Sequence, residues 1–347
     1  MQSHQGGKRV FDGTSGSMQR VTINHVAARA GVSKKTVSHV VNGLGSVSAA
    51  TRRRVEAAVA ELGYSANPQA RAFASGRTSL AILVHDGSDE GAMAQLLEGL
   101  QDGLEPQGLA VAVHRSADAT TLAAYLAAHR PLAVILPPSL SEKTDLAEVC
   151  KAAGCRTAPI LSGPGHETAL CVDERQAAAD ATGWLLALGH RRIAFIAGPD
   201  TDPRARACEL GFIAAMAGPG REQGVEIIAQ GDFSAASGER AAQLLLEISP
   251  RPTAILAAND LMAAGAMRAL LAAGLQLPQD ISVMGLGNAP IAELLMPPLA
   301  SVALPWRAIG LLAAKQLSGG TDVTVPGALG TLAGTLIPRG SVGPAVD

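Results

Sequence analysis

Four polar side chains in one short segment have the chemistry needed to contact nucleic-acid bases. A lysine donates hydrogen bonds to guanine edges, and hydroxyl and imidazole groups bond to several base edges in a major groove. Apolar Val37, Val40 and Val41 recur at i, i+3 and i+4 and can anchor the opposite face of a helix. The candidate contact residues are Lys34, Lys35, Ser38 and His39.

The surrounding residues predict the elements that must position these side chains. Thr22 can cap a first helix, and Ser33 can cap the second one. Between them Gly31 tolerates the left-handed backbone that a tight turn requires. A third helix is expected to begin after Ser48 and to end at Gly63. The segment therefore predicts a helix-turn-helix followed by a third helix.

Charge is distributed unevenly along the chain. Residues 1–78 contain 11 Lys and Arg against 3 Asp and Glu, which leaves 17 and 27 of the chain's 28 and 30 for the rest. A basic head on an acidic body is typical of a protein that contacts phosphates with one end. Arg52, in the first turn of the third helix, suits phosphate contact. The competing interpretation is a solvated basic helix bundle.

From Leu80 onward, short apolar runs alternate with longer amphipathic stretches, which predicts strands and helices of parallel, doubly wound sheets. The expected strands are 80–86, 109–114, 132–138, 192–198, 253–260 and 281–287. The expected helices are 92–108, 120–130, 176–190, 204–218, 237–248 and 261–274. We expect two such subdomains, with a ligand crevice at the carboxyl ends of the strands. The fold class is an all-α head with an α/β body.

Composition restricts the remaining possibilities. A chain of 347 residues with 48% hydrophobic content can bury two or three domains. Neither a run of about 18 apolar residues nor a secretory signal is apparent, so we expect a cytoplasmic protein. The cysteines lack metal-ligand spacing and are expected to be buried, reduced thiols. They are Cys150, Cys155, Cys171 and Cys208.

Several blocks in order resemble the lactose/galactose-repressor family of bacterial transcription regulators. They are VTINHVAARAGVSKKTVSHVVNG, VEAAVAELGYSANPQARAF, GHRRIAFIAGP, TAILAANDLMAAGAMRAL, LPQDISVMG and PPLASV. The resemblance implies a homodimer on a near-palindromic operator and a periplasmic-binding-protein-like body that responds to a small molecule. The domains expected are a flexible arm (1–19), the head (20–66), a hinge (67–78), the body (79–340, crossing between subdomains near 175 and 300–325) and a tail (341–347).

The resemblance also implies roles for residues of the head. Lys34, Lys35 and His39 fall on the family's base-reading positions, and Ser33, Thr36 and Asn42 would support the helix or contact phosphates. Many relatives have arginine where His39 stands. Arginine grips guanine with two hydrogen bonds, so operator preference should differ here. The alternative is that His39 contacts only a phosphate.

The hinge carries a second departure from the family. Asn67 can cap a short helix, and Phe73 stands where relatives usually have the leucine that is wedged into a central base step. An aromatic ring can also unstack a step. Ala70 lies one turn earlier and is small enough for close approach. The alternative is that Phe73 packs between paired hinge helices.

Matching family positions place Asp86, Asp173, Phe233 and Asn259 at the effector crevice. Phe233 could stack on a ligand or pack in the core. Relatives that bind sugars or purines have two charged groups that this chain lacks. Cys208 stands in place of an arginine, and Gly287 stands in place of an aspartate. Asn288 follows Gly287. Arg204 could clamp an acidic ligand such as a sugar acid, or lie solvated on the surface.

The sequence therefore predicts a DNA-binding regulator with no cofactor and no metal, and the family resemblance favours a repressor. The rival functions are an activator, an effector-independent repressor, a solute-binding protein and an enzyme. No catalytic motif such as GxSxG or HExxH supports the last. Effector identity, operator sequence and the direction of the response are not encoded in recognisable motifs.

Overall fold

The computed structural model describes residues 21–41, 47–64, 78–163, 169–218, 225–318 and 332–345. The chain divides into two compact units, one up to Arg71 and one from Ala72 onward. The arm expected at 1–19 and nearly all of the hinge expected at 67–78 lie outside the described residues.

The first unit contains the helices predicted for the head. They are α1 (Ile23–Ala30), α2 (Lys34–Val41) and α3 (Ala49–Leu62). Gly31 ends α1 with φ 63°, which supports the predicted turn, and Gly63 ends α3 with φ 59°. Ser33 Oγ accepts a hydrogen bond from the N–H of Thr36, so the predicted cap of α2 forms, and Ser48 Oγ caps α3 in the same way by accepting from the N–H of Thr51. The buried core of the unit is Val26, Ala27, Ala30, Val37, Val40, Val55 and Ala58.

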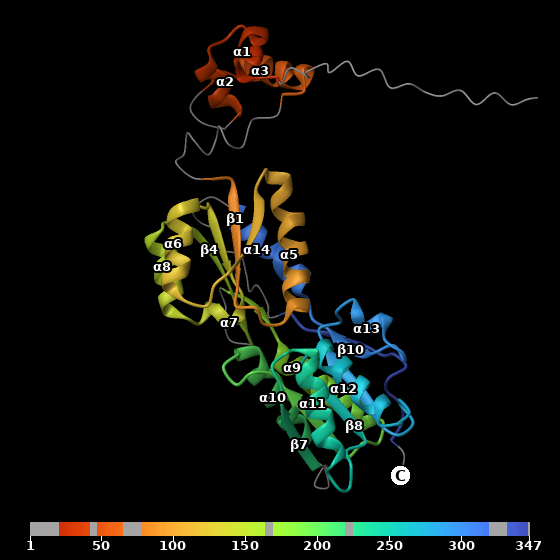
Figure 1. The fold of residues 1–347 in the computed structure, drawn as a ribbon. Helices are drawn as coiled ribbons and strands as arrows, with labels where there is room; N and C mark the ends of the chain where they lie inside the picture. The colour runs from red at the N-terminus through yellow and green to blue at the C-terminus, as the bar shows by residue number, and fades with distance from the viewer. Residues whose placement is uncertain are drawn as a thin grey trace, which may run out of the picture. The chain divides into compact units, whose positions relative to one another are not determined.

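The second unit has two subdomains, each built on its own sheet (Figure 1). The first sheet is parallel and has the order β2-β1-β3-β4-β5. Its strands are β1 (Leu80–His85), β2 (Ala110–Arg115), β3 (Ala133–Leu136), β4 (Arg156–Ser162) and β5 (Leu170–Val172). In this order β1 lies inside the sheet, with β2 on one side of it and β3, β4 and β5 following on the other side, as in doubly wound folds.

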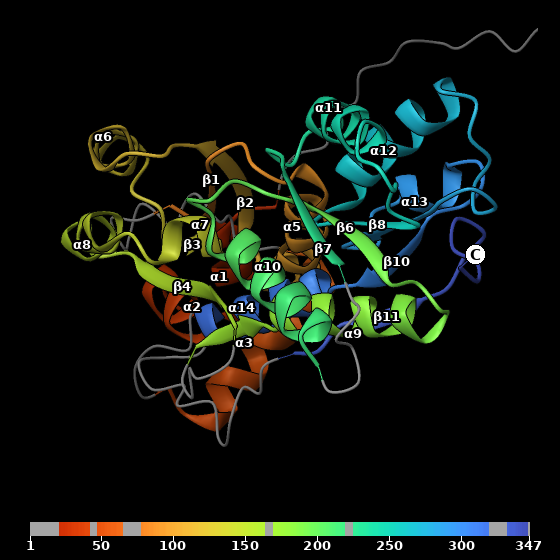
Figure 2. The ribbon, with the colours of Figure 1, turned by 90° about the horizontal axis from the view of Figure 1, so that it is seen from below.

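Helices cover both faces of this sheet (Figures 1 and 2). One face carries α5 and α14, and the other carries α6, α7 and α8. Their bounds are α5 (Glu90–Leu104), the 3-10 turn η1 (Glu105–Gln107), α6 (Ala119–His129), α7 (Pro138–Ser141), α8 (Thr144–Ala152) and α14 (Trp306–Ser318). Helices α5 and α14 approach closely at two glycines, because a Cβ on Gly99 would lie 2.0 Å from the carbonyl oxygen of Arg307, and one on Gly310 would lie 2.4 Å from that of Leu96.

The second sheet has the order β11-β10-β9-β8-β6-β7 and is parallel except for β11. Its strands are β6 (Arg192–Ala197), β7 (Val225–Gln230), β8 (Ala254–Ala257), β9 (Ser282–Leu286), β10 (Ala300–Ala303) and β11 (Thr335–Ile337). Helices α9 and α10 lie on one face, and α11 and α12 on the other (Figure 2). Their bounds, with the short α13, are α9 (Glu174–Ala187), α10 (Pro203–Met216), α11 (Ala235–Leu246), α12 (Asp260–Ala272) and α13 (Ile291–Leu294).

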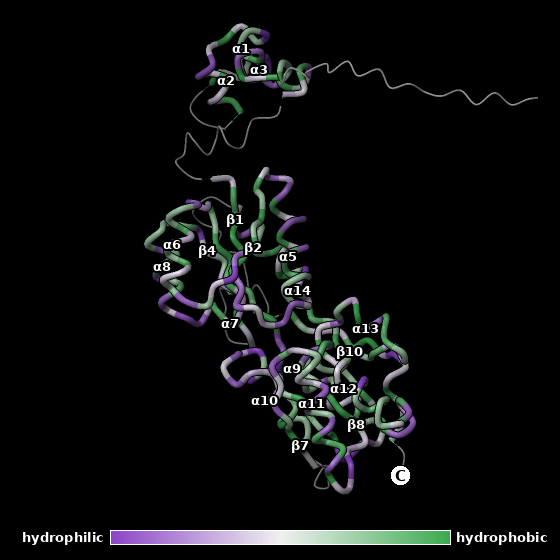
Figure 3. Tube along the Cα trace, in the orientation of Figure 1, coloured by the Kyte–Doolittle hydropathy of each residue, from purple (hydrophilic) through white to green (hydrophobic). Residues whose placement is uncertain are grey.

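The central strands are buried on both sides, as the continuous apolar runs predicted. Every residue of β3, β8 and β9 is buried. Strand β1, the neighbour of β3, is coloured mainly as hydrophobic in Figure 3. The expectation of full burial is wrong for β2, because it is the edge strand and leaves Val113 48% exposed. All six expected strands form, whereas the sequence pattern did not predict β4, β5, β7, β10 and β11.

The chain crosses between the subdomains between β5 and α9, between β10 and α14, and again before β11. The first two crossings agree with the positions expected near 175 and 300–325. The expected tail at 341–347 is not a loose segment as far as it is described. Ser341 is fully buried, and its Oγ donates to Val283 O and accepts from Ala300 N–H.

The structure also bears on the expected lack of a membrane-spanning segment and on the expected burial of the cysteines. None of the helices among the described residues is long and apolar enough to cross a membrane. Cys150, Cys171 and Cys208 are buried free thiols, as expected, but Cys155 is only half-buried.

Candidate nucleic-acid interface and interdomain crevice

Helix α2 presents the predicted contact side chains on the side of the helix away from its buried valines. Lys34 and Lys35 are exposed, and Ser38 and His39 are half-buried, whereas Val37 is buried completely. The separation arises because the helical period places the two sets on different faces. A nucleic acid can therefore reach the side chains of the four predicted contact residues, but it cannot reach that of Val37.

A shallow depression lies beside this helix and extends to the start of α3. It is lined by Val32, Ser33, Lys35, Thr36, His39, Val47, Ser48 and Thr51. Ser33 and Thr36 point their hydroxyl oxygens at each other, 2.8 Å apart, so they stabilise the beginning of α2.

Other predicted DNA contacts have different surroundings. Arg52 is half-buried in the first turn of α3. Thr22 precedes α1, and its N–H donates to Nδ1 of His25 at 3.3 Å. Asn42, Asn67, Ala70 and Phe73 lie outside the described residues.

In the body, polar contacts of Arg204, Ser162 and Gln95 join the two subdomains across the crevice. Arg204 Nη1 of α10 donates to Asp89 Oδ2, at the start of α5, at 2.9 Å. Ser162 Oγ at the end of β4 donates to Glu174 Oε2 at 2.7 Å. Gln95 Nε2 of α5 donates to the carbonyl oxygen of Gly287, directly after β9, at 3.1 Å. Arg204 Nη2 also donates to Ser88 Oγ at 3.4 Å, so this one side chain makes two of the polar contacts across the crevice.

Arg204 has the largest number of these polar partners. Its side chain is only 8% exposed, so the alternative of a solvated surface arginine is wrong. Besides its bond to Asp89, it pairs with Asp202 through Nε at 3.1 Å and Nη2 at 2.8 Å. Its Cζ lies 5.1 Å from the Phe233 ring centroid and 5.9 Å from that of Trp306. Carboxylates and aromatic faces both stabilise a guanidinium.

Electrostatics keep this arginine charged. Burial alone would lower the pKa of Arg204, but the carboxylates of Asp202 and Asp89 raise it above its usual value. Burial would also raise the pKa of Asp86, yet hydrogen bonds from the N–H and Oγ of Ser88 hold it below its usual value. Cys208, one turn after Arg204, is buried, and burial raises the pKa of its thiol well above the ordinary value. It does not substitute chemically for a cation.

Glu174 was not predicted as a site residue, although it follows Asp173. It is completely buried in the first turn of α9, and burial raises its pKa to about 7. Its Oε2 atom accepts from Ser162, but its Oε1 atom has no hydrogen-bond partner among the described residues. Acidic residues in a first helical turn usually complement the helix dipole at the surface, so burial of Glu174 could not be predicted from the sequence pattern.

Asp260 is a second buried carboxyl group that the sequence pattern missed. Its Oδ2 accepts from the N–H of Ala289 and its Oδ1 from Oγ of Ser301, both at 2.6 Å. Burial raises its pKa to about 7. A Cβ at Gly287 would lie 3.4 Å from Asp260 Oδ2, and Gly287 has φ 119°. An aspartate at 287, as in relatives, would therefore be strained and would face another carboxyl group.

The remaining predicted crevice residues use their polar atoms within the protein. Asn259 Oδ1 accepts from the N–H of Met262, and its Nδ2 donates to the carbonyl of Phe233. Asp173 caps α9 by accepting from the N–H of Gln176. Asn288 accepts from Arg339 Nη2 at 2.7 Å. Phe233 is 4% exposed and belongs to the main core, so packing and the contact with Arg204 occur together.

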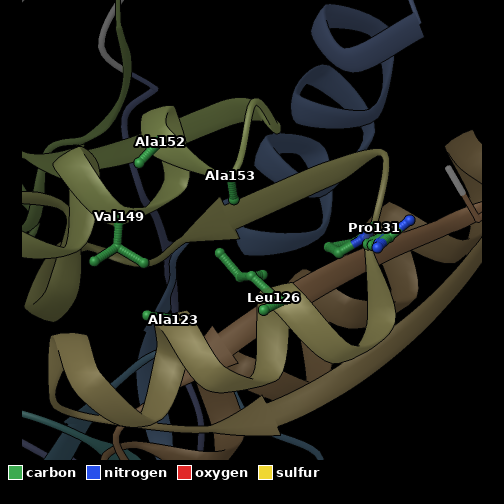
Figure 4. A pocket seen from close by; sticks show the side chains of 8 residues that line it. Ala123, Leu126, Pro131, Val149, Ala152 and Ala153 are labelled. Atoms are coloured by element: carbon green, nitrogen blue, oxygen red, sulfur yellow. The ribbon is translucent and has the colours of Figure 1, made fainter. Parts of the chain in front are cut away.

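The space found in the crevice is much smaller than a groove on the outer surface of the first subdomain. The space between Asp89, Gln95, Asn259 and Gly287 is about 10 Å³, which is roughly one water-sized probe sphere. A groove of about 490 Å³ lies instead between α6 and α8 (Figure 4). Its lining is mainly aliphatic, with Arg130 as its charged member, and offers no side-chain acceptor. A ligand larger than a water molecule fits the space between Asp89, Gln95, Asn259 and Gly287 only if the residues around it move apart.

Comparison with known proteins matches both units. Residues 22–67 match the model described as bacterial regulatory proteins, lacI family, and residues 182–342 match a periplasmic binding protein-like domain. The HTH-type transcriptional regulator CelR of Thermobifida fusca is 33% identical over 86% of this chain and 91% of its own length.

Two solved structures extend this likeness to three dimensions. The transcriptional regulator CelR-cellobiose complex has a TM-score of 0.66 and 30% identity, and covers 93% of this chain and 100% of its own. The lac repressor dimer bound to operator and the anti-inducer ONPF has a TM-score of 0.71 and 29% identity, and covers 93% and 99%.

We predict that Arg204→Met destabilises the body by roughly 3–5 kcal/mol, because it leaves Asp89 and Asp202 buried without a cation. Calorimetry of the full chain should show the melting temperature of the body lowered by at least roughly 6 °C. Arg268→Met is the matched control, since Arg268 pairs with Glu239 on the exposed surface and should cost less than about 1 kcal/mol. Equal melting temperatures for the two variants would contradict the prediction.

We also predict a pH-dependent effect of Asp260→Asn. The folded pKa of about 7 lies above the ordinary 3.8, so the stability linked to this carboxyl is complete below about pH 4 and is lost as the pH rises toward 7. Relative to the native chain, the variant should gain roughly 2–3 kcal/mol between pH 5 and pH 8. Denaturant titrations at both pH values measure this, and a constant difference would refute it.

Proposed function

Because this chain belongs to the lacI family of bacterial regulatory proteins, we propose that it binds a near-palindromic operator as a homodimer and represses transcription. That it is a DNA-binding transcriptional regulator follows from the family. The observation that carries the operator proposal is α2, which exposes Lys34 and Lys35 on a rigid helix opposite its buried valines. A helix of this kind can enter the major groove with its N-terminal residues toward the bases.

A homodimer is supported by the surface of the second subdomain. Leu294 and Met296, in and after α13, are 79% and 80% exposed, and Leu271 of α12 is 46% exposed. Exposed apolar side chains of this size favour burial in an interface. The solved lac repressor is described as a dimer on its operator. Helix α5 uses part of its surface to pack on α14 within the same chain.

We propose that the interdomain crevice binds a small-molecule effector and that its occupancy changes operator affinity. The support is that Arg204, Ser162 and Gln95 make polar contacts between the subdomains across the crevice, and that CelR, a similar protein, is described in complex with cellobiose. A ligand that separates or rotates the subdomains would alter the spacing of two paired heads. By linkage, operator DNA must change effector affinity by the same factor.

The physical basis for a sugar acid as the effector is weak. Arg204 was the candidate clamp for an acidic group, but Asp89 and Asp202 already neutralise it. Catalysis is the less supported alternative, since the similar curated proteins are transcriptional regulators. Activation rather than repression remains the second candidate within the same family, and a reporter assay with the selected operator distinguishes the two.

We predict that Lys35→Ala lowers affinity for the operator at least roughly tenfold, because a base-edge contact is worth about 1–3 kcal/mol. The operator is first selected from a random oligonucleotide pool, and affinity is then measured by fluorescence anisotropy at fixed salt. Lys151→Ala, on the exposed surface of α8, is the matched control and should bind normally. The same titration should give two chains per duplex. Identical affinities for both variants would overturn the assignment of α2.

We further predict that Phe73→Ala weakens specific operator binding while sparing binding to unrelated DNA. The reason is that an apolar wedge contributes by unstacking a particular base step, whereas non-specific binding depends on phosphates. Phe73→Leu should retain most of the specific affinity. Equal losses on both DNA types would show instead that Phe73 acts in packing.

A further inference from the structure

A groove on the outer surface of the first subdomain has no part in the proposed function. It lies between α6 and α8 and has a volume of about 490 Å³ (Figure 4). Four of its lining residues are alanines, so a gap remains between the two helices that longer side chains would fill. The other lining residues are Leu126, Pro131, Val149 and Arg130. A large side chain from elsewhere can therefore be accommodated between the helices.

The chemistry of the lining determines what the groove can hold. Its side chains are aliphatic apart from that of Arg130, so they offer a polar ligand no acceptor and only one kind of donor. An aromatic side chain suits this surface, because its ring buries apolar area against alanine, leucine and valine side chains. The guanidinium of Arg130 can in addition lie over the face of such a ring. The lining therefore favours an aromatic occupant.

The chain enters the body at the end of the groove where Arg130 lies. Thr78, the last residue of the expected hinge, donates its N–H to the carbonyl oxygen of Arg130 at 3.1 Å. Thr78 Oγ1 also donates to the carbonyl oxygen of His129 at 3.1 Å and lies 3.2 Å from that of Arg130. Both acceptors stand at the C-terminal end of α6. The hinge is therefore fixed to the same helix end that borders the groove.

The hinge sequence contains one residue that suits the groove. Phe73 is the single large apolar residue of the segment 65–79, and it lies outside the described residues. It precedes Thr78 by five positions, a length of chain that spans at most roughly 17 Å. Along α6 the groove extends from Ala123 to Arg130, which is about 10 Å at the helical rise. Phe73 can therefore reach any part of the groove in its own chain.

From these observations we propose that the groove between α6 and α8 holds the side chain of Phe73 while the protein is free of DNA, and that operator binding withdraws it. The second half rests on the proposed function, because it takes Phe73 to be the wedge that enters a base step. One side chain cannot occupy both places, so the groove competes with the operator. Burial favours a phenyl ring in the groove roughly ten- to a hundredfold over an exposed one. The operator must hold Phe73 more tightly still, as the loss expected for Phe73→Ala requires.

Photo-crosslinking of the full chain locates this side chain directly. The photoreactive p-benzoylphenylalanine replaces Phe73, and the protein is irradiated without DNA and again when saturated with the selected operator. We expect crosslinks within one chain, on peptides of α6 or α8, that disappear on the operator. Crosslinks of the free protein that join two chains or map to other peptides would overturn the proposal. Groove crosslinks that persist in the operator complex would overturn the withdrawal.

Variants that fill the groove test the same idea with the native Phe73. Ala127→Trp and Ala152→Trp, one on each helix, should displace its side chain. Chymotrypsin cleavage after Phe73, identified by mass spectrometry, should then become roughly tenfold faster or more, because it follows the exposed population. Operator affinity should rise by a similar factor. Ala187→Trp, at an exposed position of α9, is the matched control and should behave as the native chain.

Equal cleavage rates in the native chain and in both groove variants would contradict the proposal. The cleavage assay contains no DNA, so its outcome is independent of operator binding. Protection of Phe73 in a chain that selects no operator would therefore refute the proposed function and leave the groove assignment standing. Normal operator binding with an unprotected Phe73 would refute the groove assignment alone.

Discussion

The pairing of the Arg204 guanidinium with Asp89 and Asp202 is the constraint on which the arrangement of the body depends. Asp202 belongs to the same subdomain as the arginine, whereas Asp89 begins the first helix of the other one. An arginine buried this deeply stays charged only because carboxylates compensate for its lost hydration. The same bonds that solvate the cation therefore also hold the two sheets at a fixed separation.

Close helix packing within each subdomain supports the contact between Arg204 and Asp89. The α5–α14 pair and the α11–α12 pair each contact through glycines, since a Cβ on Gly238 or on Gly265 would also meet backbone atoms at about 2 Å. Helix α5 carries Asp89 at its start, and α14 begins with Trp306 beside Arg204. Because such interfaces cannot deform gradually, a change in the crevice is expected to move whole subdomains.

The sequence predicted the head, six of the strands and most of the long helices, because their hydrophobic periods are strong and uninterrupted. It did not predict β5, β10 and β11, which have only three or four residues each and gain their stability from neighbouring strands. The crevice was harder to predict. Arg204 was identified, but its partners were not, since Asp89 and Asp202 are ordinary helix caps in sequence. Glu174 and Asp260 resemble solvated first-turn acids, and only tertiary burial changes their chemistry.

The C-terminal segment has a practical consequence for protein engineering. Ser341 bonds to backbone groups of both β9 and β10, and Gly343 accepts from Nε2 of the buried His190. A deletion that removed these few residues would leave buried groups on two adjacent strands without partners, each at a cost of about 1–3 kcal/mol. Fusion partners and affinity tags are therefore better attached beyond the final residue than in place of the last seven.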